Sequence, residues 1–329
     1  MKMKASFSAP LFVLIVYCLA LASEIIGNKL VLSEGNVHLS VIILQILIFM
    51  IPAIIFSRLK GVGYSMKLNV KLFSPTKLGS IVFSALTLIC GSILIRVAEI
   101  YVFGVESFGF SMFDKHLNAL TSDEFLFTAT AFAVVPAITE EFVFRAIVLT
   151  EYNEDGCGAI SSSIISALLS SMLFFSLDKL PIFFLAGIIF SMVTYATGSS
   201  LAAMLCHMIF NFYGIFAEKY VIKAIINPSN KIISIFVFVL LFLVLAFIMF
   251  GELEHMVRKT GMMGTPTPSY RLKKSDDGKT PDIAATEAAE DGEEGAVIGS
   301  SAKMNIEMFF SPTFLLCILF FAVSLFSFR

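Results

Sequence analysis

Long apolar stretches separated by short polar segments run through the sequence, and they constrain its fold more than any other feature. Hydrophobic residues make up 57% of the 329 residues and charged residues 15%, and the mean hydropathy is +0.89. Continuous apolar runs of about 18 residues or more are typical of transmembrane helices, whereas transmembrane strands alternate apolar and polar residues. The sequence therefore predicts an all-α, polytopic transmembrane bundle of about eight core helices plus an extra C-terminal helix. The expected spans are 9–32, 39–57, 78–103, 125–150, 159–177, 181–197, 199–216, 232–250 and 308–328.

Lysine and arginine in the loops predict how this bundle is oriented. Segments 58–77 and 258–279 are both rich in these residues, so we expect both to be cytoplasmic. With nine spans, the N-terminus is then cytoplasmic and the C-terminus outside. The first span resembles a signal peptide, but its apolar pattern continues past the cleavage-like Ala20-Leu-Ala22, so we expect it to be retained. We predict a multi-pass integral protein of the plasma membrane, surrounded by the lipid bilayer.

Composition divides the chain into three parts. Residues 1–251 form the predicted transmembrane domain, 252–307 a polar linker, and 308–329 a C-terminal transmembrane helix. The linker is basic in its first half and acidic in its second, and small residues fill the rest. We expect a disordered cytoplasmic tether, whose basic half also suits anionic lipid headgroups.

Three ionisable residues, Glu140, Glu141 and Arg145, lie inside one predicted span. Since each charge at the bilayer centre costs roughly 2.5 kcal/mol or more, such residues need partners and are candidates for function. Glu141 and Arg145 are four residues apart, so they share a helix face and can pair directly. Glu140 is turned about 100° away, which leaves it available for chemistry. The plainer interpretation is a structural clamp between helices.

A second polar group lies in another span, where His207 and Asn211 are also four residues apart. Their N–H groups are suited to stabilising an oxyanion or holding a water. A third candidate, Asp178, closes the string that begins at Phe174, where the fifth span is expected to end. The plainer interpretations are an interhelical hydrogen bond for the first group and a helix-end loop for Asp178.

The order of these groups along the chain resembles the CPBP family of membrane proteins. This family comprises CAAX proteases and bacteriocin-processing proteins, and it is also called the Abi or type II CAAX prenyl endopeptidase-like family. Its Glu-Glu-x-x-x-Arg motif matches Glu140, Glu141 and Arg145, and its His-x-x-x-Asn motif matches His207 and Asn211. The similarity covers a core of about residues 78–250. The family's second motif is Phe-x-x-x-His, and here the histidine position holds Asp178.

The resemblance implies an intramembrane glutamic-type endopeptidase that cleaves membrane-associated peptides or proteins. Glu140 would be the general base for a water, with Glu141 and Arg145 as its support. His207 and Asn211 would bind the oxyanion. Asp178 stands where the family has a histidine that helps to position the water. We expect no cofactor and no nucleic-acid partner.

Three alternatives remain open from the sequence. The first is a catalytically silent binding or immunity protein on the same scaffold, which the substitution at Asp178 favours. The second is a metal-dependent protease in which Glu140, Asp178 and His207 hold zinc. The third is a transporter, although the chain shows no pair of interrupted spans repeated between its halves.

Overall fold

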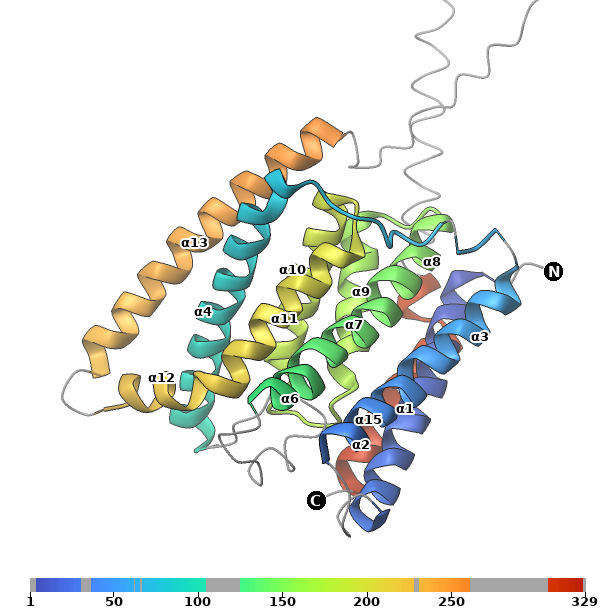
Figure 1. Cartoon of the computed structure of the whole chain (residues 1–329), viewed down its shortest axis with the longest axis horizontal. Helices are drawn as coiled ribbons and strands as arrows, with labels where there is room; N and C mark the ends of the chain where they lie inside the picture. Colours follow the sequence, from blue (N-terminus) through green and yellow to red (C-terminus); the bar gives the residue numbers. More distant parts are fainter. Residues whose placement is uncertain are drawn as a thin grey trace, which may run out of the picture.

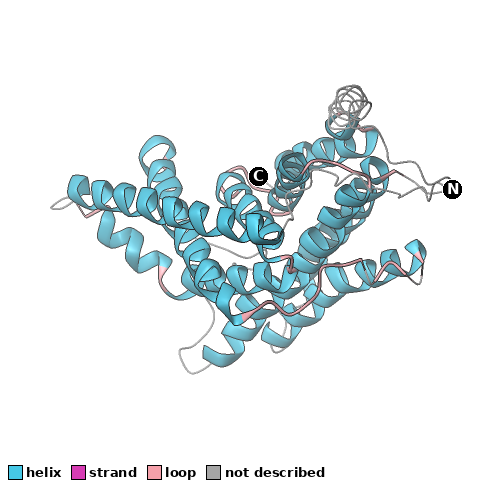
Figure 2. Ribbon diagram, turned by 90° about the horizontal axis from the view of Figure 1, so that it is seen from above, coloured by secondary structure: helices cyan, strands magenta, loops and turns pink. Residues whose placement is uncertain are grey.

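The structure is a computed structural model that describes residues 4–30, 37–61, 63–65, 67–104, 125–227, 231–260 and 307–327. In these ranges every regular element is a helix, so the predicted all-α bundle is confirmed (Figures 1 and 2). The helices are α1 (Ala5–Leu30), α2 (Val37–Gln45), η1 (Ile46–Met50), α3 (Ile51–Lys60), η2 (Pro75–Lys77), α4 (Leu78–Phe103), α6 (Phe125–Ala129), η4 (Thr130–Val134), α7 (Val135–Glu141), η5 (Phe142–Val148), α8 (Leu149–Glu154), α9 (Ala159–Met172), α10 (Leu180–Thr197), α11 (Ser200–Phe216), α12 (Glu218–Ile225), α13 (Lys231–Thr260) and α15 (Pro312–Ser327).

Each of the nine predicted spans coincides with helix, but not every helix is long enough to cross a bilayer alone. Five helical segments in the described part of the chain have the required length and hydropathy, or six if the bent pair α11 and α12 forms one span. The five are Ala5–Ser23, Val37–Lys60, Pro75–Val102, Leu180–Thr197 and Lys231–Met256. The apolar helices α9 and α15 are shorter, and the predicted span 125–150 is divided among several helical pieces. The total of nine spans stays a prediction.

Two predicted boundaries differ from the structure. Helix α9 ends at Met172 rather than at 177, because Phe175 adopts a positive φ of 46° that a continuing helix does not allow. Helix α13 continues to Thr260, past the expected start of the linker at 252. Its apolar stripe extends there through the buried Leu253 and Met256. The rest of the predicted linker, 261–306, lies outside the described residues.

Two large hydrophobic clusters form most of the core, one on each side of the molecule, and a third, smaller cluster joins α4 and α12. The first joins α1, α2, α3, α9 and α15, and the second joins α4, α10, α11 and α13. Figure 1 shows α4 and α13 at one side, α1 to α3 at the other, and α6 to α9 between them. Helix α7 packs on α11 from one side and on α2 and η1 from the other. The segment with the two glutamates therefore lies where the two clusters meet.

Helix α7 lies between two π-helices, and proline accounts for one of them. Pro136 stands in the first turn of α7, directly after η4, and Pro52 stands in the first turn of α3, directly after η1. Proline has no N–H to donate and its ring would meet the carbonyl four residues earlier, so the helix must widen before it. No proline explains η5, which follows the two glutamates and contains Arg145.

Polar contacts fasten the bundle at its ends. At the end that carries the lysine-rich segment 58–77, Lys60 pairs with Glu151, Lys67 with Glu154, and Lys77 donates to the Thr197 carbonyl at 3.0 Å. The first and last described helices are joined as well, since the Thr313 hydroxyl donates to the Ser6 carbonyl at 3.2 Å. Helix α15 is thus part of the bundle core through α1.

Candidate active site

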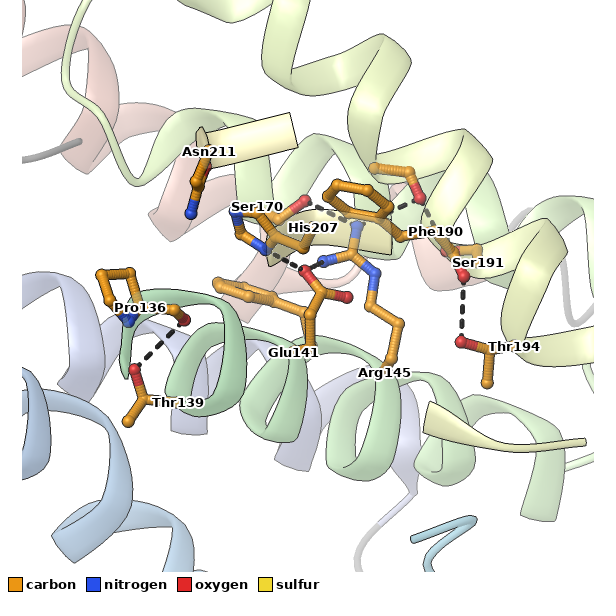
Figure 3. Close-up of polar contacts among 12 residues, drawn as sticks. Pro136, Thr139, Glu141, Arg145, Ser170, Phe190, Ser191, Thr194, His207 and Asn211 are labelled. Carbon is orange, nitrogen blue, oxygen red and sulfur yellow. Dashed lines mark hydrogen bonds and ion pairs between the residues drawn. The ribbon is translucent and has the colours of Figure 1, made fainter. Parts of the chain in front are cut away.

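Glu141, the last residue of α7, is the centre of the polar site. One of its oxygens, Oε1, accepts a hydrogen bond from Arg145 Nη1 at 3.0 Å and another from His207 Nδ1 at 2.9 Å (Figure 3). All three side chains are buried. The pairing of Glu141 with Arg145 is the one that the four-residue spacing predicts. The bond to His207 joins α7 to α11.

Arg145 extends the network to two more helices. Its Nη2 donates to the Gly187 carbonyl of α10 at 3.0 Å and to the Ser170 hydroxyl of α9 at 3.3 Å. The guanidinium group also lies over the ring of Phe190, 5.4 Å from its centroid. The carbonyl of Gly187 is reachable because α10 approaches α9 closely there. Arg145 therefore holds α9 and α10 against the segment that carries the glutamates, as Figure 3 shows.

Glu140 has a different environment from its neighbour. Both ion pairs of the site end on Glu141, and both glutamates line a small cavity that also involves α9, α10 and α11. The cavity has a volume of about 10 Å³, close to the smallest space that holds one water, roughly 10–15 Å³. Its walls are Glu140, Glu141, Phe144, Arg145, Ser170, Phe174, Phe183, Ala186, Gly187, Phe190 and His207. A carboxyl group and a water-sized space thus adjoin each other inside an aromatic shell.

His207 and Asn211 lie one turn apart on α11, as their spacing predicts. The His207 ring stacks on Phe190 with 4.8 Å between centroids, and it lines the cavity. Asn211 is also buried, and its Nδ2 donates to the carbonyl of Ala133 in η4 at 3.4 Å. Asn211 is not among the residues that line the cavity. His207 is therefore at the site itself, and Asn211 lies beside it.

Asp178 lies away from this cavity. It follows the end of α9, in the turn before α10, where the Ser176 hydroxyl donates to its carboxylate. Its charge acts on Glu99 of α4, whereas the residues around the cavity do not include it. Because helix α9 ends before Phe174, the four-residue spacing no longer puts Phe174 and Asp178 on one helix face. Phe174 reaches the cavity wall and Asp178 does not.

The zinc alternative requires Glu140, Asp178 and His207 to come together, and the structure does not assemble this set. Glu140 and His207 both line the cavity, but Asp178 is elsewhere. In the part of the chain that the structure describes, no group of three or more His, Cys, Asp or Glu side chains is placed to hold a metal ion. The donors that remain are two carboxylates and one imidazole beside an arginine, and the cation of that arginine opposes a metal ion at the same place.

The sequence interpretation missed Gln45, the last residue of α2. It is fully buried, and its Oε1 accepts a hydrogen bond from the Thr139 hydroxyl of α7 at 3.0 Å. Thr139 directly precedes Glu140. The available signal was a lone amide within the apolar stretch 41–56, where an unpaired polar side chain would be costly.

Several buried polar atoms around the site have no hydrogen-bond partner among the described residues. They are Gln45 Nε2, Glu141 Oε2, Arg145 Nε and Asn211 Oδ1. Most buried polar atoms in folded proteins are paired, so each exception calls for an explanation, such as a catalytic role or a bound water. Two of these atoms belong to cavity-lining residues, Glu141 and Arg145, and this favours a functional interpretation of the cluster over a purely structural clamp.

Comparison with known protein families supports this interpretation. Residues 122–213 match the family model described as type II CAAX prenyl endopeptidase Rce1-like. This match bears out the predicted family for the matched segment. The matched Rce1-like segment runs through α6 to α11, so it contains both glutamates, Arg145, His207 and Asn211, whereas Gln45 lies outside it. No curated protein and no solved structure matches the chain. At the level of the family, the match supports a CAAX-type intramembrane protease.

Proposed function

We propose that this protein is an intramembrane endopeptidase in which Glu140 activates a water. The observation that carries the proposal is the water-sized cavity beside Glu140. The adjacent Glu141 is already engaged, because it accepts hydrogen bonds from Arg145 and His207. A carboxylate committed to an ion pair is a poor base, whereas one that faces a water can accept its proton. The two neighbouring glutamates thereby take different roles.

In the proposed reaction, the water oxygen in the cavity attacks the carbonyl carbon of a peptide bond while Glu140 accepts one of its protons. A tetrahedral intermediate with a negatively charged oxygen results. Glu140 then returns the proton to the peptide nitrogen, the carbon–nitrogen bond breaks, and an acid and an amine leave. No cofactor is needed for these steps, and every proton that Glu140 takes it also gives back.

The contact between Glu141 and His207 sets which nitrogen of His207 faces the reaction. A carboxylate can only accept, so the Nδ1 that lies 2.9 Å from Glu141 Oε1 carries a hydrogen. The other nitrogen, Nε2, is then the one available for the substrate. In the imidazolium form Nε2 donates, which suits an oxyanion. With Glu140, Glu141 and Arg145 also charged, the net charge of these four groups is zero. The Asn211 amide, one turn away, lies outside the cavity wall and donates to the Ala133 carbonyl, so His207 is the proposed donor to the oxyanion.

We propose a membrane-associated peptide or protein as the substrate. Phe144, Phe174, Phe183 and Phe190 line the cavity together with Arg145 and both glutamates. An apolar surround excludes bulk water and strengthens the electrostatic interactions within it. A segment that already lies in the membrane reaches such a site without first passing through water.

The test is cleavage of a library of prenylated and unprenylated membrane peptides by the purified protein in lipid nanodiscs, read by mass spectrometry. Glu140→Gln keeps the shape of the side chain and removes the base, so we expect the rate to fall about 10²–10⁴-fold. Glu154→Gln is the matched control, because Glu154 is exposed and remote from the cavity. A Glu140→Gln protein with the parental rate would overturn the assignment of the base.

Asp178 supplies a second comparison in the same assay. Because it lies outside the cavity, we expect Asp178→Asn and Asp178→His to cleave within about twofold of the parent, the range of surface changes. A large gain in rate for Asp178→His would instead indicate that residue 178 lies at the catalytic site. No cleavage by any of these proteins would favour the silent binding alternative over the peptidase.

A further inference from the structure

The side chain of Gln45 lies where it can act on the proposed base, and this inference rests on the proposed function. Gln45 ends α2, and both α2 and η1 pack against α7, the helix that presents Glu140. The side chain has no exposed surface at all. A buried primary amide needs partners for one oxygen and two N–H groups, because each unmade bond is costly in an apolar interior.

Thr139 determines which way this amide points. Its hydroxyl donates to Gln45 Oε1 at 3.0 Å, and the same hydroxyl lies 3.0 Å from the Val135 carbonyl in its own helix. With the amide oxygen turned to Thr139, the amide nitrogen points away from it. Gln45 Nε2 makes no hydrogen bond of normal geometry among the described residues. The two N–H groups of the Gln45 amide are thus available to donate to a neighbouring acceptor.

That neighbour is Glu140. It follows Thr139 directly in α7, so the bond from Thr139 to Gln45 and the packing of α2 on α7 bring its carboxyl group next to the Gln45 amide. Glu140 also borders the cavity, whereas Gln45 does not. The amide therefore reaches the carboxyl group from α2, whereas His207 reaches the site from α11, and both of these helices pack against α7.

We propose that Gln45 is a positioning residue for Glu140: an N–H of its amide holds the carboxylate so that its free oxygen points into the cavity, and Thr139 holds the amide. Gln45 touches neither the water nor the peptide. It acts through Glu140, and it does so from outside the Rce1-like segment 122–213. The N-terminal helices are then part of the catalytic machinery and not only an anchor for it.

The first measurement separates positioning from substrate binding. In the proteolysis assay we expect Gln45→Met, which keeps the length but loses the N–H groups, to lower kcat about 10- to 100-fold with KM unchanged, as for a misaligned reacting group. Thr139→Val should lower kcat in the same direction, because it removes the hydroxyl at nearly constant shape. Thr139→Ser restores that hydroxyl, so it should recover most of the lost rate.

Thr87→Val is the matched control for these changes. Thr87 is a buried threonine of α4 whose hydroxyl donates to the Phe83 carbonyl of its own helix, so its loss should leave kcat at the parental value. If Thr139→Ser is as slow as Thr139→Val, the hydroxyl is not what matters and the proposal fails. It also fails if Gln45→Met keeps the parental kcat, or if only the yield of folded protein changes.

An infrared measurement keeps the inference separate from the proposed function. The difference spectrum between the parent and Glu140→Gln assigns the carboxyl bands of Glu140 in the folded protein without any substrate. Gln45→Met should shift those bands by removing a hydrogen bond, and Thr87→Val should not. Unshifted bands overturn the role of Gln45 whether or not the protein cleaves peptides. If the bands shift but the protein cleaves no peptide, the contact between Gln45 and Glu140 is supported and only the proposed peptidase function is rejected.

Discussion

At the scale of single residues, the contrast between two adjacent glutamates is the central feature of the site. Glu141 shares one oxygen between Arg145 and His207, so its charge is compensated inside the bundle. Among the described residues Glu140 makes no such pair, and its carboxyl group borders the cavity. One helix turn therefore provides both a fixed charge that holds three helices together and a carboxyl group that is available for proton transfer.

The first prediction at this scale concerns Arg145. Removing it leaves the buried carboxylate of Glu141 without its guanidinium partner, so Arg145→Ala should lower the free energy of unfolding by about 3–5 kcal/mol. Thermal unfolding in detergent measures the loss. Arg58→Ala is the control, because Arg58 is exposed at the end of α3, and it should change stability by no more than about 0.5 kcal/mol. Equal melting temperatures for the two variants would contradict the role of Arg145.

The candidate site was partly predictable from the sequence, for a physical reason. The pair Glu141–Arg145 follows from helix periodicity alone, which fixes residues four apart on one face. The bond from His207 to Glu141 depends on how α11 packs on α7, and no spacing within one helix determines it. Asp178 was placed by a motif that assumes a continuous helix, and the turn at Phe175 breaks that assumption.

At the scale of the helices, the contact between α9 and α10 positions Arg145. A Cβ atom added to Gly187 would lie 2.6 Å from the Ala167 Cα and 2.7 Å from its Cβ, far closer than atoms can approach. Glycine therefore allows the two helices to touch. It also brings the Gly187 carbonyl to Arg145, so helix packing and the polar site depend on the same residue.

The second prediction tests this contact. Gly187→Ala should force α9 and α10 apart and cost about 1–3 kcal/mol of stability, as overpacking does, and it should also lower the proteolytic rate by displacing Arg145. Melting temperature and kcat are the two measurements. Gly79→Ala in α4 meets nothing within 4 Å, so it should be neutral or slightly stabilising. A Gly187→Ala protein as stable and active as Gly79→Ala would show that the helices have room to spare.

The helical pieces were harder to predict than the helical class. Apolar runs indicate helix, and Pro136 and Pro52 each mark a disturbance in a run. Whether the helix kinks, breaks or forms a π-turn at such a proline depends on how the neighbouring helices pack against it. The local sequence does not determine that packing. The π-helix η5 has no marker in the sequence at all. The predicted span 232–250 ends before α13 does, because polar residues after 251 are interspersed with the buried Leu253 and Met256.

At the scale of the whole molecule, two opposite ends can be distinguished. The segment after α3, the loop between α8 and α9, and the end of α10 meet at one end, where Lys60, Lys67 and Lys77 make their contacts. Helix α12 lies at the other end in Figure 1. The excess of positive charge predicts that the first end is cytoplasmic.

The third prediction concerns this orientation. Leu72→Cys and Tyr220→Cys place thiols at exposed positions of the two ends. In a Cys18→Ser background, a membrane-impermeant maleimide added to intact cells should label Tyr220→Cys and miss Leu72→Cys until the cells are opened. The native Cys157 should contribute little, because burial and the nearby Asp155 raise the pKa of its thiol to about 11, so almost none is thiolate at neutral pH. The reverse labelling pattern would invert the orientation.

Helices α1 and α15 are neighbours in the bundle although 307 residues separate Ser6 from its partner Thr313. A ribosome adds about 5–20 residues each second, so α1 enters the membrane about 15–60 s before α15 is complete. During that interval the face of α1 that α15 will cover must be shielded by lipid or by an insertion factor. The matched segment can assemble earlier, because its helices follow one another closely along the chain. Slowing translation of the last part of the chain would therefore prolong a state in which the matched segment has assembled and the α15-binding face of α1 is still uncovered.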